Sequence, residues 1–370
     1  MKTKTFLSLA GFLALFLLIA CSKDEAKPKP VAGFTASKTA VMVGEVIQFT
    51  NTSTDATSYA WSFGDGTTST LESPTKTYDA AGTYTVALTA TGAGGSNLSS
   101  IEITVTAASV YFMDSSDELL ENLVLDVNKT VTTVKDLAGM SGVGIAYDDV
   151  HNKIYFSDFY DADTPNGKIW MMNIDGTSAV AIADTINDPY AVTLDLPAGK
   201  VYWVDNNGNV SRANLDGSSP DTALVNIVGG GLRAIALDKD NNKMYFFDAT
   251  NDILYWANMD GTGVAPLITG IYGYAICVDV VNHKIYYDEE YTPALMRANL
   301  DGTGVEEIYK NPDAVVGKSR IYGITIDYES NKLYWSNRDA GEIYRANLDG
   351  TSREILKTGL TSPRGIFLKK

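Results

Sequence analysis

The chain has little cysteine and little histidine. Its 370 residues include only 2 of each. His151 and His283 stand in expected turns, and the sequence implies no Cys or Ser partner for either. We therefore expect neither a catalytic triad nor a histidine-ligated metal. Cys277 lies in the apolar run 275–278, which is typical of a buried core position.

Positive charge is also scarce. The chain has 29 Lys and Arg residues against 45 Asp and Glu residues, so its formal net charge is −16 at pH 7. Nucleic-acid binding depends on Lys and Arg side chains that neutralise phosphates. We therefore expect no nucleic-acid partner. An acidic surface also repels anionic lipid headgroups, so we expect membrane contact only through a lipid anchor.

Long apolar runs are missing, except for one short run at the N-terminus. The run 6–20 follows Lys2 and Lys4 and is shorter than the about 20 residues that a membrane-spanning helix needs. We interpret residues 1–20 as a secretory signal peptide. The run ends in Leu18-Ile19-Ala20-Cys21, which resembles the lipobox of bacterial lipoproteins. That resemblance implies that Cys21 is acylated and becomes the first mature residue.

Residues 21–30 form a linker after this cysteine. Ser22, next to this cysteine, resembles the residue that directs lipoproteins to the outer membrane. The following Lys-Asp-Glu is similar to the surface-export signal of some Gram-negative lipoproteins. The alternating prolines at 28 and 30 predict an extended, stiff spacer. Because several acyl chains anchor a protein stably, we expect an outer-membrane lipoprotein that is exposed at the cell surface.

Residues 31–107 alternate apolar and polar side chains in short segments separated by turn residues. Four such segments, at 46–49, 59–63, 84–88 and 101–105, predict a small β-sandwich. The stretch 61–67, Trp-Ser-Phe-Gly-Asp-Gly-Thr, resembles the signature of PKD domains. The resemblance implies an Ig-like sandwich that acts as a spacer or as a carbohydrate or protein contact module. We expect Trp61 and Phe63 to point inward, and Asp65 to stabilise a turn rather than to bind a metal.

After residue 108 the chain repeats one unit every 41 to 48 residues. Each unit carries a tetrad of Tyr, an aromatic residue, any residue and an acidic residue or Asn. The tetrads begin at Tyr111, Tyr155, Tyr202, Tyr245, Tyr286 and Tyr334. An Asn-x-Asp-Gly turn and a short apolar run that ends in Asp recur in the same order. Four strand-length segments in each unit predict the blades of a β-propeller.

The tetrads in register with five Asp-Gly turns resemble the YWTD family, the LDL-receptor class B repeat, over residues 109–370. This resemblance implies six blades, and tetrad carboxylates that tie adjacent blades. Glu289 and Asn337 replace the final Asp, so we expect weaker ties there. The Asp-Gly pairs predict type I′ hairpins between outer strands.

The two ends of this region complement each other. Residues 362–370 match the first strand of a unit, whereas the region opens on a second strand at residue 109. We therefore expect the C-terminal strand to complete the first blade and to remove an exposed sheet edge. The predicted fold is all-β, with an Ig-like sandwich at 31–107 and a six-bladed propeller at 108–370.

A binding site is expected where the repeats differ. Five residues before each strand-ending Asp, or before Lys369, a ring of variable residues should surround the channel mouth, above a ring of Gly and Ala. Tyr and Arg predominate in binding hot spots, although Arg before Gly also has a structural explanation in the repeat family. The predicted ligand-binding residues are Tyr190, Arg233, Tyr272, Tyr274, Arg320, Tyr322 and Arg364.

Other acidic loops lie at the same end. One holds Asp158, Asp161 and Asp163, and another holds residues 288–290. Clustered carboxylates can take Ca²⁺, but this spacing matches no defined calcium loop. We interpret them as solvated charge and predict no metal site and no cofactor, with Ca²⁺ as the one ion that these loops could take.

The leading functional prediction is a module that binds a polysaccharide or a protein at the cell surface. An enzyme of lactonase or lyase type, with its site in the central channel, is the alternative. It ranks lower because the ring offers no obvious base, and we predict no catalytic residue. A purely structural envelope or adhesion role is the third possibility.

Overall fold

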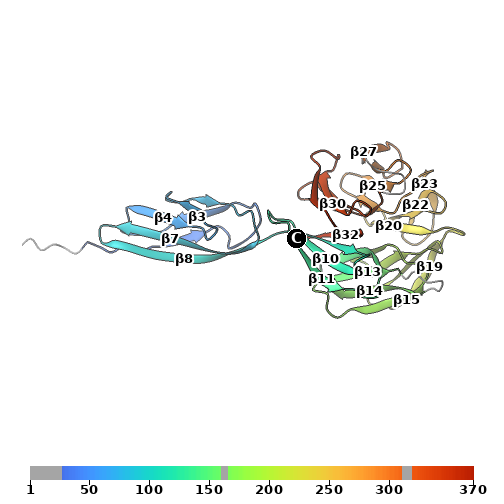
Figure 1. Ribbon diagram of the computed structural model, residues 1–370, viewed down its shortest axis with the longest axis horizontal. Coiled ribbons are helices and arrows are strands. Elements are labelled where there is room, and N and C mark those ends of the chain that lie inside the picture. The colour runs from blue at the N-terminus through green and yellow to red at the C-terminus, as the bar shows by residue number, and fades with distance from the viewer. Residues whose placement is uncertain (1–26, 160–165, 311–318) are drawn as a thin grey trace, which may run out of the picture. The chain divides into compact units, whose positions relative to one another are not determined.

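The computed structural model describes residues 27–159, 166–310 and 319–370. The predicted signal peptide and Cys21 lie outside these residues. Among the residues described, no helix is long and apolar enough to span a membrane. The chain forms two compact units, each built from β-strands (Figure 1).

The first unit is a sandwich of two sheets. One sheet has the order β1 (Phe34–Ala36), β3 (Ile47–Asn51), β6 (Thr75–Lys76). The other has the order β2 (Ala40–Met42), β8 (Gly95–Thr106), β7 (Gly82–Gly92), β4 (Ser58–Ser62), β5 (Thr68–Ser69). Trp61 and Phe63 are buried, and Trp61 lies edge-on to Phe34 with ring centroids 4.9 Å apart. The predicted inward alternation of these aromatics is confirmed.

The Asp65 carboxylate stabilises its turn. It accepts hydrogen bonds from the backbone N–H and the hydroxyl of Thr67, and it forms an ion pair with Lys76 at 2.5 Å. Partial burial opposes ionisation, but the bonds from Lys76 and Thr67 outweigh it and lower the pKa of Asp65 to about 2. The following Gly66 has a φ of 88°, a conformation that favours glycine.

The second unit consists of six four-stranded sheets, which we call blades 1 to 6 and give from the inner strand outward. Blade 1 is β32 (Pro363–Lys369), β9 (Ser109–Asp114), β10 (Leu119–Val124), β11 (Val131–Asp136). Blade 2 is β12 (Gly142–Asp148), β13 (Lys153–Asp158), β14 (Gly167–Asn173), β15 (Val180–Ile186). Blade 3 is β16 (Val192–Asp195), β17 (Lys200–Val204), β18 (Asn209–Asn214), β19 (Asp221–Asn226).

Blades 4 to 6 repeat this plan. Blade 4 is β20 (Leu232–Asp238), β21 (Lys243–Asp248), β22 (Ile253–Asn258), β23 (Ala265–Thr269). Blade 5 is β24 (Ile276–Asp279), β25 (Lys284–Glu289), β26 (Ala294–Asn299), β27 (Glu306–Lys310). Blade 6 is β28 (Ile321–Asp327), β29 (Lys332–Asn337), β30 (Glu342–Asn347), β31 (Glu354–Lys357). The predicted all-β fold with six blades is confirmed.

The C-terminal strand closes the ring, as predicted. β32 pairs antiparallel with β9, from Pro363 opposite Asp114 to Lys369 opposite Ser109 (Figure 1). The inner strands β12 and β28 both contact β32. Blade 1 is therefore built from the two ends of the repeat region, and its inner edge is covered.

The tetrad side chains join the blades through their hydroxyls as well as through the predicted carboxylates. The tetrad hydroxyls of Tyr155, Tyr245 and Tyr286 donate to carbonyl oxygens of the following blade, at 3.2, 3.4 and 3.0 Å. The carboxylates of Asp114, Asp158 and Asp248 accept amide N–H bonds from the loop that connects the preceding blade to their own, whereas Asp205 accepts from its own turn. The tyrosines therefore connect neighbouring blades, and Asp114, Asp158 and Asp248 hold the incoming loop.

The substituted tetrads keep such contacts by other means. Glu289 still accepts a long bond of 3.5 Å from the amide of Tyr272. In blade 6, Asn337 accepts from its own turn at Ala340, and Asp339 accepts from the incoming amide of Arg320 at 2.9 Å. In blade 6, Asp339, two positions after Asn337, therefore accepts the incoming amide in place of the missing tetrad Asp.

The Asp-Gly turns are not type I′, which corrects the prediction. In the first of them only Gly176, with a φ of 79°, has the positive φ that type I′ requires at both central residues. The amide of Gly176 donates to the carbonyl of Asn173 at 2.9 Å, so the glycine closes the turn instead of lying at its centre. Asp175 accepts from both the amide and the hydroxyl of Thr177, which stabilises this longer loop.

Candidate functional site

The mouth of the central channel is formed by the loops that lead into the six inner strands. Directly below the mouth, the predicted small residues surround the axis: Gly144, Ala191, Ala234, Ala275, Gly323 and Gly365. A Cβ on Gly365 would lie 2.5 Å from the carbonyl oxygen of Val143, and one on Gly144 would lie 2.6 Å from that of Tyr190. These strands approach so closely that only small residues fit. A cavity of about 280 Å³ continues down the axis.

Four of the predicted residues form one connected cluster, which we call the mouth cluster: Tyr272, Tyr274, Tyr322 and Arg364. The rings of Tyr274 and Tyr322 stack with centroids 4.6 Å apart, and the hydroxyls of Tyr272 and Tyr274 are 2.6 Å apart. The Arg364 guanidinium carbon lies 5.1 Å from the centre of the Tyr322 ring. Burial raises the pKa of Tyr272 and Tyr322, so both hydroxyls stay neutral.

Tyr190 and Arg233 form a second pair at the same mouth. The guanidinium of Arg233 lies 3.9 Å from the centre of the Tyr190 ring and donates to the Asn206 side chain at 2.7 Å. Burial raises the pKa of Tyr190, and Arg364 and Tyr274 also influence it. These electrostatic effects indicate that the pair and the mouth cluster surround the same opening. A cation–π contact of this kind stabilises the arginine in place.

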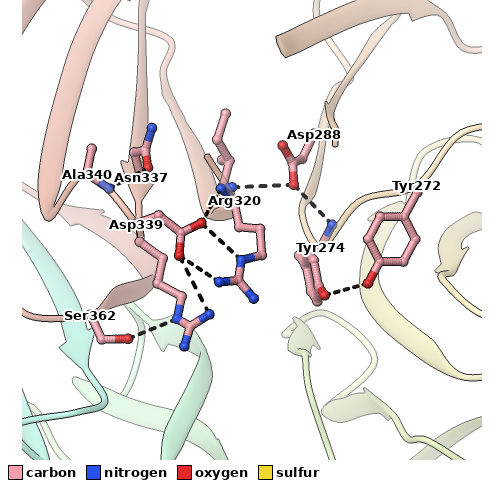
Figure 2. A network of polar contacts seen from close by, with 10 residues as sticks. Tyr272, Tyr274, Asp288, Arg320, Asn337, Asp339, Ala340 and Ser362 are labelled. Carbon is pink, nitrogen blue, oxygen red and sulfur yellow. Dashed lines mark hydrogen bonds and ion pairs between the residues drawn. The ribbon is translucent and has the colours of Figure 1, made fainter. Parts of the chain in front are cut away.

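Arg320 differs from the other predicted residues because its charge is already neutralised. Its guanidinium makes a two-pronged ion pair with Asp339, at 2.7 and 3.0 Å. Arg338 approaches the same carboxylate at 3.8 Å and donates to the Ser362 hydroxyl at 3.2 Å. Figure 2 shows this network beside the pair Tyr272 and Tyr274. Sequence reasoning identified Arg320 but missed Arg338 and Asp339.

The acidic segment 288–290 is buried, which corrects its interpretation as solvated charge. Asp288 is 1% exposed and accepts from the amides of Tyr274 at 3.3 Å and Ile321 at 3.4 Å (Figure 2). Glu290 is also 1% exposed, and neither of its carboxylate oxygens has a hydrogen-bond partner in the part of the chain that the structure describes. The prediction that no base stands at the mouth therefore overlooked two buried carboxylates.

Burial has a large effect on these two carboxylates. It raises the pKa of Asp288 well above its usual range, and the charge of Glu290 adds to the shift. It raises the pKa of Glu290 to about 7, although Arg320 opposes this. A carboxyl group that titrates near neutral pH can take up or release a proton under physiological conditions.

The register of the repeat holds the signal that could have revealed Asp288. It occupies the third tetrad position, where the other blades carry buried side chains: Met113, Ser157, Val204, Phe247 and Ser336. A carboxylate at this position had to be buried as well, because the strands place the third residue of each tetrad in the same environment.

The remaining predicted features carry no site. No group of three or more His, Cys, Asp or Glu residues among those described is arranged to hold a metal. Asp158 is buried and accepts from the Ser141 amide and the Trp170 indole, whereas Asp161 and Asp163 lie outside the described residues. His151 contacts Asp148 in a turn at the opposite end of the channel. Cys277 is only partly buried and lines the channel.

Both units are similar to known proteins. Residues 27–107 match the family model of the PKD domain. A stretch of 85 residues is 32% identical to the low-density lipoprotein receptor-related protein 5-like protein of Homo sapiens, covering 22% of this chain and 33% of that protein. A stretch of 144 residues is 27% identical to the protein cueball of Drosophila willistoni, covering 36% of this chain and 21% of that protein. The chain thus spans a third or less of these relatives.

The fold has a clear counterpart among solved structures. A chain in the crystal structure of a nidogen–laminin complex superposes with a TM-score of 0.59 at 16% identity, covering 70% of this chain and 98% of that one. At this identity the likeness concerns the fold alone. The chain therefore carries a PKD domain at residues 27–107, followed by a β-propeller similar to the YWTD propellers of the LDL-receptor type.

Proposed function

We propose that this protein is a surface-exposed outer-membrane lipoprotein, anchored through Cys21, whose propeller binds a polysaccharide or a protein ligand at the channel mouth. The PKD domain serves as a spacer or as an accessory binding module. The lipid anchor fixes the protein to the membrane, and the propeller presents its mouth to the ligand.

The observation that supports binding is the composition of the mouth. Tyrosines and arginines from separate blades converge there, held by stacking and cation–π contacts, whereas the repeated residues of each blade serve the architecture. Tyr and Arg combine contact area with directed hydrogen bonds, and such prepositioned side chains lose little entropy on binding.

Paired Tyr274→Ala and Arg364→Ala substitutions test this function. A glycan array and a peptide pull-down with the full-length protein in detergent identify the ligand. The double variant should then lose at least about 10-fold in affinity, the effect expected of a binding hot spot. A matched control is Tyr309→Ala with Arg353→Ala, because this pair makes a similar contact, at 4.2 Å, between β27 of blade 5 and the turn before β31 of blade 6. Unaltered binding in the mouth variant would refute the proposal.

One observation favours a second candidate, an enzyme of lactonase or lyase type. Glu290 is buried beside the mouth, has a pKa of about 7, and has carboxylate oxygens without a hydrogen-bond partner among the described residues. Such a group could act as a general base or acid. Lactonase and lyase assays with and without added divalent metal, on the wild type and on Glu290→Gln, test this candidate. Turnover that the substitution abolishes would support it.

A further inference from the structure

Arg364 is a half-buried cation whose Nε is buried. Its Nε has no hydrogen-bond partner, and it makes no ion pair within 4 Å, among the residues that the structure describes. The nearby Asp114 does not pair with it within 4 Å, and its oxygens accept the amides of Thr361 and Ser362 at 2.9 and 2.6 Å. A charge that is partly removed from water and has no partner carries a desolvation cost. An anion supplied from outside would remove that cost.

The groups around Arg364 add to its positive charge. Arg338 and Arg320 lie close enough to lower the pKa of Arg364, after burial itself, which is the largest cause. Arg233 stands across the mouth on Tyr190. Asp339 is paired with Arg320. The mouth therefore combines several guanidinium groups with the carboxylates of Asp339 and Glu290, and Arg364 forms no ion pair among the described residues. Such an unpaired cation attracts and orients an anionic ligand.

The surface around the mouth suits a polar ligand. Of the large apolar side chains exposed in the described residues, only Val228 and Tyr291 belong to loops at this end of the propeller. The fully buried core of a protein–protein interface is more apolar than the rest of the protein surface. The mouth offers instead tyrosine rings whose hydroxyls donate and accept hydrogen bonds, as in the pair Tyr272 and Tyr274.

From these observations we infer that the ligand is an acidic polysaccharide, and that Arg364 binds a carboxylate of one of its uronate residues. The Tyr274 and Tyr322 rings lie beside the sugar, and Arg338 and Arg233 attract the flanking carboxylates. The inference rests on the proposed function and specifies its ligand class. A guanidinium matches a carboxylate in both charge and geometry, so this contact provides selectivity against neutral sugars.

The test compares charged and neutralised forms of the same polymers. Polygalacturonate, alginate and hyaluronan are each titrated into the full-length protein in detergent, alongside forms in which the carboxylates are methyl-esterified. We expect at least one acidic polymer to bind, with at least about 10-fold lower affinity for its ester, since esterification removes the charge-assisted hydrogen bond to Arg364. Arg364→Gln should cause a similar loss for the acidic polymer and little change for the ester.

Arg353→Gln is the matched control, because Arg353 is exposed on an outer turn and contacts only aromatic rings there. If Arg364→Gln fails to fold, the comparison of acid and ester on the wild type still decides. Equal affinity for acids and esters overturns the inference, as does an array in which only neutral glycans or peptides bind, and both leave the proposed binding function intact. If no glycan or peptide binds at the mouth, the proposed function itself fails.

Discussion

At the scale of single residues, Glu290 should make stability depend on pH. Its pKa is about 7 in the folded protein and 4.5 in an ordinary exposed glutamate. Between these values the folded state holds a proton that the unfolded state has released. The contribution of Glu290 to the free energy of unfolding is therefore largest at acidic pH and decreases as pH rises from about 4.5 to 7.

We expect Glu290 to account for a loss on the order of 2–3 kcal/mol between pH 4.5 and 8, because each pKa unit corresponds to about 1.4 kcal/mol. Urea denaturation of the wild type and of Glu290→Gln across this range measures it. The Gln variant should show a flatter profile. Glu329→Gln is the control, because Glu329 is exposed and pairs only with Lys370. A wild-type profile parallel to that of Glu290→Gln would contradict the prediction.

At the scale of elements, the strand β32 should control the stability of the whole propeller. It completes blade 1 and buries Ile366 and Phe367, and Phe367 stacks between Tyr111 and Tyr147 with centroids 4.9 and 5.0 Å away. Deleting residues 362–370 exposes the inner edge of β9 and breaks the ring. We expect a loss of at least about 4 kcal/mol, counting roughly 2 kcal/mol for each of the two large side chains.

Thermal denaturation of this truncated chain measures the effect. Deleting Lys370 alone is the control, since it removes ion pairs with Asp327 and Glu329 but leaves every residue of β32 that pairs with β9 in place. The pair with the exposed Glu329 contributes about 1 kcal/mol or less. If the long truncation melted at the temperature of the intact protein, the closure of blade 1 by β32 would be wrong.

At the scale of the whole molecule, the proposed anchor predicts where the protein resides. Cys21→Ser removes the only thiol that the signal sequence offers for acylation. We expect the variant to lose its attachment to the membrane fraction, because the proposed attachment depends on the acyl chains at Cys21. Fractionation and incorporation of labelled fatty acid measure this outcome, with Cys277→Ser as the control. Labelled Cys21→Ser protein in the membrane fraction would refute the anchor.

Much of this fold could be predicted from the sequence because repetition makes it local. Each blade contains four strands and one tetrad, so counting the tetrads gave the number of blades. The two complementary ends of the repeat region indicated the closing strand. The turn type was predicted wrongly, because Asp-Gly is compatible with two hairpin loops and only the backbone φ at Asp175 distinguishes them.

The residues of the candidate site were only partly predictable, for a different reason. Counting along the repeat identified Tyr274, Tyr322 and Arg364, since symmetry brings equivalent positions to the same axis. The partners of these residues come from loops that differ between blades, and no repeat predicts where such a loop leads. Arg338 and Asp339 reach the mouth in this way, and Asp339 neutralises Arg320.

The sequence by itself determined the class of fold, the order of the blades and the ring of residues around the axis, because strand periodicity and turn chemistry are local properties. Only the tertiary structure decided which charges are buried and which are paired. Glu290 appeared solvated in the sequence and is buried, while Arg320 appeared available and is paired. Burial and pairing depend on side chains brought together from different blades, and these set the electrostatic character of the mouth.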